Sequence, residues 1–82
     1  MAEQVKIYGA DWCGDTRRSL RVLESAGVEF DYINVDENAD AEKKVIEFSK
    51  GKRRIPLVEI ASETGTQSLA VPTDSELKKA LG

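Results

Sequence analysis

Hydrophobic residues recur along the chain of 82 residues with two different periods, and each change of period marks a new element. Short runs rich in β-branched and aromatic residues are typical of strands, and they fall at 5–8, 30–35, 57–60 and 67–71. Apolar residues three or four positions apart are typical of amphipathic helices, and they fall within 14–26, 38–50 and 73–81. The predicted order of elements is βαβ followed by αββα.

The residues between these stretches are of the kinds that begin and end helices. Gly27 and Gly51 end the first two helices, and Asn38 caps the second. A capping box that starts at Thr73 opens the last helix. We therefore expect an α/β fold in a single domain over 1–82, with a four-stranded mixed sheet and three helices on its two faces.

Composition narrows the classes of function. The chain has one cysteine and no histidine, so it has no internal disulfide and no zinc site built from cysteine and histidine. Its net charge of −3 argues against general nucleic-acid binding, and no apolar run approaches the roughly 20 residues of a membrane span. An unpaired thiol and the short polar start of the chain favour a cytoplasmic protein, which we expect to be a monomer.

The single cysteine lies where a strand is followed by a helix. Cys13 comes after the strand that ends at Tyr8 and after a turn, and a helical pattern begins directly behind it. At a helix N-terminus, unpaired backbone N–H groups and the helix dipole favour a thiolate over a thiol. A lone cysteine is often only a small buried residue, but the polar and charged neighbours of Cys13 indicate a reactive one.

Basic residues gather in two segments, which hold seven of the twelve lysines and arginines. They are Arg17, Arg18 and Arg21 in the first segment, and Lys50, Lys52, Arg53 and Arg54 in the second. Each segment alone is typical of a solvated surface. The two share a role only if the fold brings both of them near Cys13.

Three stretches together resemble a known family. They run from Trp12 to Arg18, from Gly51 to Pro56 and from Pro72 to Leu77. With the predicted order of elements, they make the chain similar to the glutaredoxins, the shortest form of the thioredoxin fold. The similarity is greatest to small bacterial glutaredoxin-like and mycoredoxin-like proteins, and it covers nearly the whole chain.

The resemblance implies a role for the backbone before the third strand. Pro56 would be cis and would lie against Cys13, and the backbone of Ile55 would pair with a bound thiol peptide. Otherwise Pro56 only starts an edge strand. Trp12 would shield the thiolate or stack on a partner, or else it packs half-buried over the first helix.

The same geometry would bring the basic segments to the cysteine. Arg17, Arg53 and Arg54 would then stabilise the thiolate and attract anionic disulfides such as glutathione conjugates. The resemblance thus unites two charge clusters that the composition leaves separate.

The chain departs from the family at the second cysteine of the motif, whose place is taken by Thr16. A dithiol redoxin releases its product when this second thiol attacks the mixed disulfide, and threonine cannot do so. The hydroxyl of Thr16 could donate a hydrogen bond to the Cys13 thiolate, or the residue packs in the first helical turn. What is left is a monothiol route, in which a second molecule of small thiol releases the one that Cys13 has taken.

Two further departures concern the site for the small thiol. Ala10 stands where glutaredoxins usually carry a lysine, and the run 72–75 replaces their Gly-Gly turn. The N–H groups of Asp74 and Ser75 could bind a carboxylate at the start of the last helix, although a capping box needs no ligand.

Three functions stay open at this point. The first is a monothiol glutaredoxin-like oxidoreductase without a tightly bound cofactor, which acts on mixed disulfides of proteins with glutathione or a similar small thiol as co-substrate. The second is a redoxin fold that has lost turnover and serves as a binding module. The third is an iron–sulfur carrier, because Cys-Gly-Asp-Thr parallels the Cys-Gly-Phe-Ser motif of proteins that bridge a [2Fe–2S] cluster between two subunits.

Overall fold

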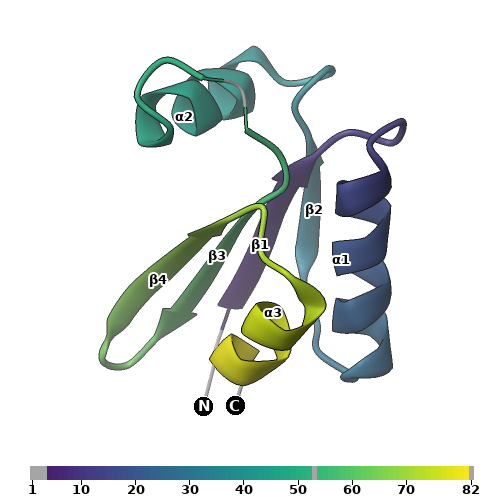
Figure 1. Ribbon diagram of the computed structural model, residues 1–82. Coiled ribbons are helices and arrows are strands. Elements are labelled where there is room, and N and C mark those ends of the chain that lie inside the picture. Colours follow the sequence, from purple (N-terminus) through teal and green to yellow (C-terminus); the bar gives the residue numbers. More distant parts are fainter. Residues whose placement is uncertain (1–3, 53, 82) are drawn as a thin grey trace.

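The computed structural model describes residues 4–52 and 54–81, and its elements follow the order expected from the sequence (Figure 1). The strands are β1 (Gln4–Gly9), β2 (Asp31–Asn34), β3 (Leu57–Ser62) and β4 (Gly65–Ala70). The helices are α1 (Gly14–Ser25), α2 (Ala39–Phe48) and α3 (Asp74–Leu81). The predicted α/β class is confirmed. Within the two described ranges, no helix is long and apolar enough to cross a membrane.

The strands form one mixed sheet in the order β2-β1-β3-β4. The pair β1–β2 is parallel, as a connection through a helix allows, whereas β3 runs antiparallel to both β1 and β4. The parallel register aligns Gly9 with Asn34. The turns that follow β1 and β2 therefore come out side by side at one end of the sheet.

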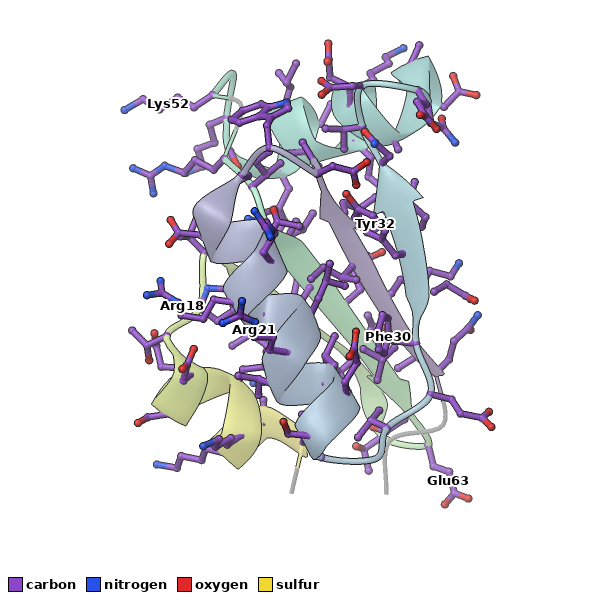
Figure 2. All side chains as sticks on the ribbon, turned by 90° about the vertical axis from the view of Figure 1, so that its right-hand side faces the viewer. Arg18, Arg21, Phe30, Tyr32, Lys52 and Glu63 are labelled. Carbon is purple, nitrogen blue, oxygen red and sulfur yellow. The ribbon has the colours of Figure 1, made fainter. Side chains whose placement is uncertain are left out.

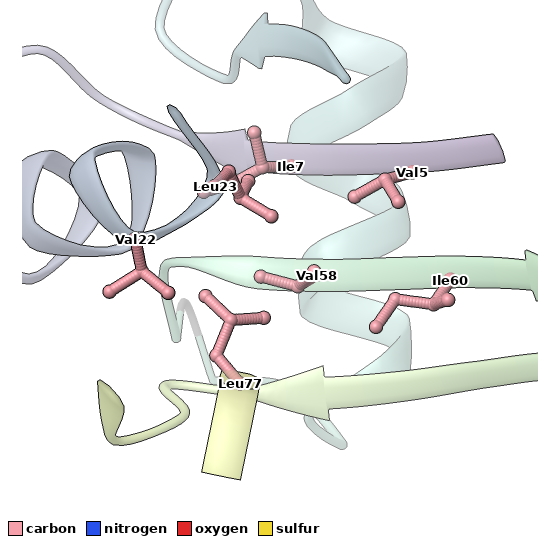
Figure 3. Packing of buried hydrophobic residues seen from close by; sticks show 7 residues of the cluster. All are labelled: Val5, Ile7, Val22, Leu23, Val58, Ile60 and Leu77. Carbon is pink, nitrogen blue, oxygen red and sulfur yellow. The ribbon is translucent and has the colours of Figure 1, made fainter. Parts of the chain in front are cut away.

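Two apolar clusters hold the helices on opposite faces of the sheet. Alternate residues of β1 and β3 pack with α1 and α3, and Figure 3 shows this cluster: Val5, Ile7, Val22, Leu23, Val58, Ile60 and Leu77. The intervening strand residues pack with α2 in a second cluster: Tyr8, Val35, Ala41, Val45 and Leu57. Each fully buried aliphatic side chain contributes about 1.5–3 kcal/mol, so both faces of the sheet anchor their helices.

Local signals decide where α1 and α2 begin and end. The side chain of Asn38 accepts the backbone N–H of Ala41 at 3.0 Å, so the predicted N-cap is confirmed. Gly27 ends α1 in the left-handed conformation, with φ 70°. After α2, Lys50 has φ 58°, and Gly51, which follows it, has φ 95°. The helix therefore stops before the glycine that the sequence indicates.

The entry to α3 combines a favourable cap with an unusual backbone. Glu76 N–H donates to Thr73 Oγ1 at 3.1 Å, and Thr73 N–H donates to the Glu76 carboxylate at 2.9 Å, so the predicted capping box is confirmed. The prediction that the fourth strand reaches Val71 is wrong, because β4 ends at Ala70 and Val71 turns into the left-handed region with φ 47°. A β-branched residue rarely adopts this conformation.

Candidate active site

Cys13 lies just beyond the carboxyl end of β1 and is the N-cap of α1, with φ −83° and ψ 116°. Its N–H donates to the carbonyl of Ala10 at 3.1 Å, and its own carbonyl accepts the N–H of Arg17 at 3.1 Å. A tight turn thus leads directly into the helix, and the thiol is partly buried there. The predicted position at a helix N-terminus is confirmed, one residue before the first helical residue.

The backbone before β3 lies against this thiol. The Ile55–Pro56 peptide bond is cis, as the family resemblance implies, and Pro56 is buried. The Sγ of Cys13 lies 3.9 Å from the carbonyl oxygen of Ile55, a long contact in which the thiol is the donor. The same segment is also held by the residue that follows β4, since the N–H of Val71 donates to the carbonyl of Pro56 at 2.8 Å. Segments that follow β1, precede β3 and follow β4 therefore meet around Cys13.

Thr16, which replaces the second cysteine of the motif, is fully buried in the first turn of α1. Its side chain packs onto the backbone of Gly9 so closely that a Cβ added at that glycine would overlap it. Its Oγ1 has no hydrogen-bond partner among the described residues. Packing is thus the role that the structure shows for Thr16, and the predicted hydrogen bond from its hydroxyl to Cys13 is not formed in it.

Trp12 and Asp11 tie the turn before Cys13 to β2 and to the turn after it. Trp12 is 66% exposed, and its indole Nε1 donates to the Asp36 carboxylate at 2.7 Å. The hydroxyl of Tyr32 donates to the Asp11 carboxylate at 2.7 Å. Burial and this hydrogen bond raise the pKa of the Tyr32 phenol well above its usual value, so the hydroxyl stays a donor at any physiological pH.

Sequence reasoning did not identify Asp36 and Tyr32 as partners of the turn before Cys13. They lie 24 and 21 positions from their partners, and no local spacing relates them. The parallel pairing of β1 with β2 brings them there. The predicted βαβ order favours that parallel pairing, and it is the signal from which the neighbourhood of the two turns follows.

Acidic and basic side chains around Cys13 differ in how they are paired. The carboxylates of Asp11, Asp15 and Asp36 each accept a hydrogen bond from a neighbouring side chain. Arg17 and Arg54 are exposed and have no ion-pair partner within the described part of the chain. Because the donors to Asp11 and Asp36 are neutral groups, these two hydrogen bonds leave the carboxylates charged, and exposed arginines and carboxylates share the rim of the site.

The first basic segment serves more than one purpose. Arg18 pairs with Asp15 at 2.6 Å and with Asp74 at 3.5 Å, so it bridges the starts of α1 and α3. Figure 2 shows Arg18 and Arg21 along α1, whereas Lys52 projects from the loop at the upper end of the view. Arg53, which the sequence assigns to the site, lies outside the described residues.

Hydrogen bonds within the chain hold the start of α3. The capping box holds its first turn, and the partly exposed carboxylate of Asp74 forms an ion pair with Arg18. Asp74 and Ser75 are both exposed. Their N–H groups stay a predicted seat for a carboxylate, next to the bridge between the two helices.

A second polar cluster lies on the α2 face of the sheet. Lys44 Nζ donates to Glu59 at 2.9 Å and to the Tyr8 hydroxyl at 3.2 Å, and it lies 5.3 Å from the centre of the Tyr8 ring. Burial opposes ionisation of Glu59, but the hydrogen bonds from Lys44 and Tyr8 outweigh it and lower the pKa of this carboxyl. This cluster secures α2 to the sheet.

Other features of the surface lie apart from the cysteine. A hollow of about 530 Å³ is lined by residues at the start of β1 and just before β2, at the opposite end of the sheet. Among residues 4–52 and 54–81, no group of three or more His, Cys, Asp or Glu side chains is placed to hold a metal ion.

The profile of the Glutaredoxin family matches residues 5–64, which include both Cys13 and Pro56. The chain belongs to the glutaredoxin family. Mycoredoxin 1 of Corynebacterium glutamicum is 33% identical to this glutaredoxin over 75 residues, which cover 90% of this chain and 92% of that protein. A function in thiol–disulfide chemistry follows from this membership.

Solved structures agree with this assignment. NrdH-redoxin of Escherichia coli, a glutaredoxin-like protein with a thioredoxin-like activity profile, superposes with a TM-score of 0.73 at 25% identity, over 93% of this chain and 92% of its own. A glutaredoxin of Archaeoglobus fulgidus superposes with a TM-score of 0.72 at 29% identity, over 99% of this chain and 87% of its own. The predicted glutaredoxin-like form of the thioredoxin fold is confirmed.

Proposed function

We propose that this glutaredoxin is a monothiol thiol–disulfide oxidoreductase, which removes glutathione or a similar small thiol from mixed disulfides of proteins. The observation that carries the proposal is the position of Cys13, at the N-cap of α1 and 3.9 Å from the backbone of the cis-proline segment. The family supplies the redoxin chemistry. Because the chain has one cysteine, the chemistry is restricted to routes that need one thiol.

The first step is a thiol–disulfide exchange. The Cys13 thiolate attacks the glutathione sulfur of a protein–glutathione disulfide, a Cys13–glutathione disulfide forms, and the protein leaves as a thiolate that takes up a proton. The unpaired N–H groups at the start of α1 favour the attacking anion. We propose that the buried hydroxyl of Thr16, which makes no hydrogen bond to Cys13 or to any other described residue in the structure, donates to the sulfur once it is a thiolate.

The second step regenerates the free cysteine. The thiolate of a second glutathione molecule attacks the glutathione sulfur on Cys13, which yields oxidised glutathione and the Cys13 thiolate. In the net reaction, the protein–glutathione disulfide and one glutathione molecule yield the protein thiol and oxidised glutathione. A reducing cytoplasm, with millimolar small thiol held reduced, is the compartment in which we place this cycle.

The residues around Cys13 divide the work of binding. The backbone of Ile55 pairs with the backbone of the bound thiol, and Arg17, Arg53 and Arg54 attract its carboxylates. Trp12 covers one side of the disulfide. The N–H groups of Asp74 and Ser75 take a further carboxylate at the start of α3.

Reduction of a glutathionylated peptide tests this function. The reaction is followed as NADPH oxidation through glutathione and glutathione reductase, with Cys13→Ser as the matched control. We expect turnover that the control lacks. If the wild-type protein shows no turnover although iodoacetamide still alkylates Cys13, the proposal fails for glutathione, and either another small thiol or a binding role takes its place.

A parallel assay addresses the identity of the small thiol. Glutaredoxin-type proteins use glutathione or mycothiol as co-substrate. The same peptide, loaded with mycothiol and assayed with mycothiol and its reductase, therefore forms the second arm. A higher kcat/KM in one arm assigns the thiol, and turnover in neither arm refutes the oxidoreductase.

A further inference from the structure

The structure assigns a specific task to Asp36, which holds Trp12 as a fixed platform for the small-thiol half of a disulfide on Cys13. This inference rests on the proposed function and deepens it, since it says which residue sets the affinity for the small thiol. Asp36 is a positioning residue, because in this role it acts through Trp12.

The first argument is the geometry of the pair. The indole Nε1 lies 2.7 Å from Asp36 Oδ2, a short hydrogen bond to a charged acceptor. Packing restrains a tryptophan ring that is 66% exposed less than it restrains a buried one, so polar contacts contribute more to its orientation. The bond to Asp36 fixes the ring direction beside the cysteine that follows it in the sequence.

The second argument is that Asp36 is itself held in place. Its backbone N–H donates to the side chain of Asn34, the last residue of β2, at 2.9 Å. The preceding Val35 is buried, and its N–H donates to the carbonyl of Gly9 at 2.9 Å, which continues the β1–β2 pairing. The anchor of the ring is therefore attached to the sheet rather than to a free loop.

The third argument is the cost of leaving such a ring in water. A covered aromatic side chain buries roughly 150–250 Å², and the free energy of binding becomes more favourable in proportion to the area covered. A ring that is already oriented loses little conformational entropy when a ligand covers it. An exposed and anchored tryptophan next to the reactive thiol is thus suited to receive the apolar and backbone atoms of a small thiol attached to Cys13.

The test combines three variants with two kinds of measurement. Asp36→Ala removes the acceptor, whereas Asp36→Asn keeps an amide oxygen that can accept the indole N–H without the charge. Tyr32→Phe removes the other bond that ties the same turn to β2, Tyr32–Asp11, and leaves Trp12 and Asp36 intact. Glu37→Gln is the control for charge, since it neutralises the next residue.

The kinetic measurement is reduction of the glutathionylated peptide. We expect Asp36→Ala to raise KM about three- to tenfold, with kcat changed by less than about twofold. In Asp36→Asn the rise in log KM should be at most about half as large. Tyr32→Phe and Glu37→Gln should leave KM unchanged. An equal rise of KM in Tyr32→Phe would mean that only the stiffness of the turn matters, and it would overturn the inference.

The spectroscopic measurement needs no turnover, so it separates this inference from the proposed function. Trp12 is the only tryptophan of the chain, and its emission reports this position alone. Cys13 is loaded with glutathione by exchange with excess oxidised glutathione, and loading is verified by mass. We expect loading to shift or quench the emission in the wild-type protein and in Asp36→Asn, but not in Asp36→Ala. Emission that is insensitive to loading in the wild-type protein refutes the platform, whether or not the protein turns over.

Discussion

The carbonyl oxygen of Ile55 and the Sγ of Cys13 lie 3.9 Å apart, although 42 positions separate the two residues in the sequence. A disulfide on Cys13 therefore faces the backbone that leads into Pro56, and a backbone recognises any peptide-like thiol without regard to its charge. Discrimination between anionic and neutral disulfides must come from the side chains around it. Arg17 and Arg54 are the arginines there that lack an ion-pair partner among the described residues.

Neutralising these arginines should weaken binding of an anionic disulfide. We expect Arg17→Gln and Arg54→Gln each to raise KM for a glutathionylated peptide about two- to fivefold, because exposed charge pairs contribute little individually. The effect should shrink as salt is raised, since ions screen exposed charges. Arg21→Gln is the matched control, with the same charge change on the same helix. An equal effect of Arg21→Gln would show that only the net charge of the protein matters.

The close contact between β1 and α1 predicts a sharp difference between two glycines. A Cβ at Gly9 would overlap the Thr16 side chain, whereas a Cβ at Gly14 meets nothing within 4 Å. Gly9→Ala should therefore lower the free energy of unfolding by about 1–3 kcal/mol, and Gly14→Ala should leave it unchanged or raise it slightly. Urea unfolding measures both. Thr16→Ala in the Gly9→Ala background should restore part of the loss, and a purely additive double variant would contradict the contact.

The hydroxyl of Thr16 should lower the stability of the fold and raise the reactivity of Cys13. Because Oγ1 is buried without a partner among the described residues, Thr16→Val should raise the free energy of unfolding by about 1 kcal/mol. If the hydroxyl serves the Cys13 thiolate as proposed, the same variant reacts more slowly with iodoacetamide at neutral pH. Thr16→Ser keeps the hydroxyl and should react like the wild-type protein. An unchanged rate in Thr16→Val would restrict Thr16 to packing.

The sequence predicts the order of elements and the position of Cys13 because both depend on local patterns. Apolar periodicity marks the strands and helices, and the cap at Asn38 and the box at Thr73 are set by residues within one turn. The partners of Trp12 and Arg18 depend instead on how distant elements pack. The bridge from Arg18 to Asp74 forms only after α3 has docked beside α1, so no spacing along the chain reveals it.

Val71 predicts a substitution that should stabilise the protein. Its φ of 47° costs a β-branched residue about 1–2 kcal/mol, since Cβ approaches the backbone carbonyl in this conformation. Asparagine tolerates the left-handed region. Glycine adopts it without a steric clash, and its only cost is the larger conformational entropy that it gives the unfolded chain. Val71→Asn and Val71→Gly should therefore raise the free energy of unfolding by about 1 kcal/mol. Val71→Ile keeps the branched Cβ and should gain nothing, and a similar gain in Val71→Ile would rule out backbone conformation as the cause.

The cluster of Lys44, Glu59 and Tyr8 predicts how stability depends on acid. Hydrogen bonds from Lys44 and Tyr8 overcome burial and hold the pKa of Glu59 below its ordinary value of 4.5. A carboxyl with a lowered pKa in the folded state stabilises the protein above its unfolded pKa, and it loses this contribution as pH falls through the folded pKa. The wild-type protein should therefore exceed Lys44→Met in stability at pH 7, by less than about 1 kcal/mol because Lys44 is half exposed.

Urea unfolding from pH 7 down to about 3 should show this difference shrink below about pH 5. Lys43→Met, which changes a neighbouring exposed lysine, should show no such pH dependence. A difference between wild type and Lys44→Met that stays constant across the range would mean that the Lys44 stem packs on Tyr8 and that its charge contributes nothing.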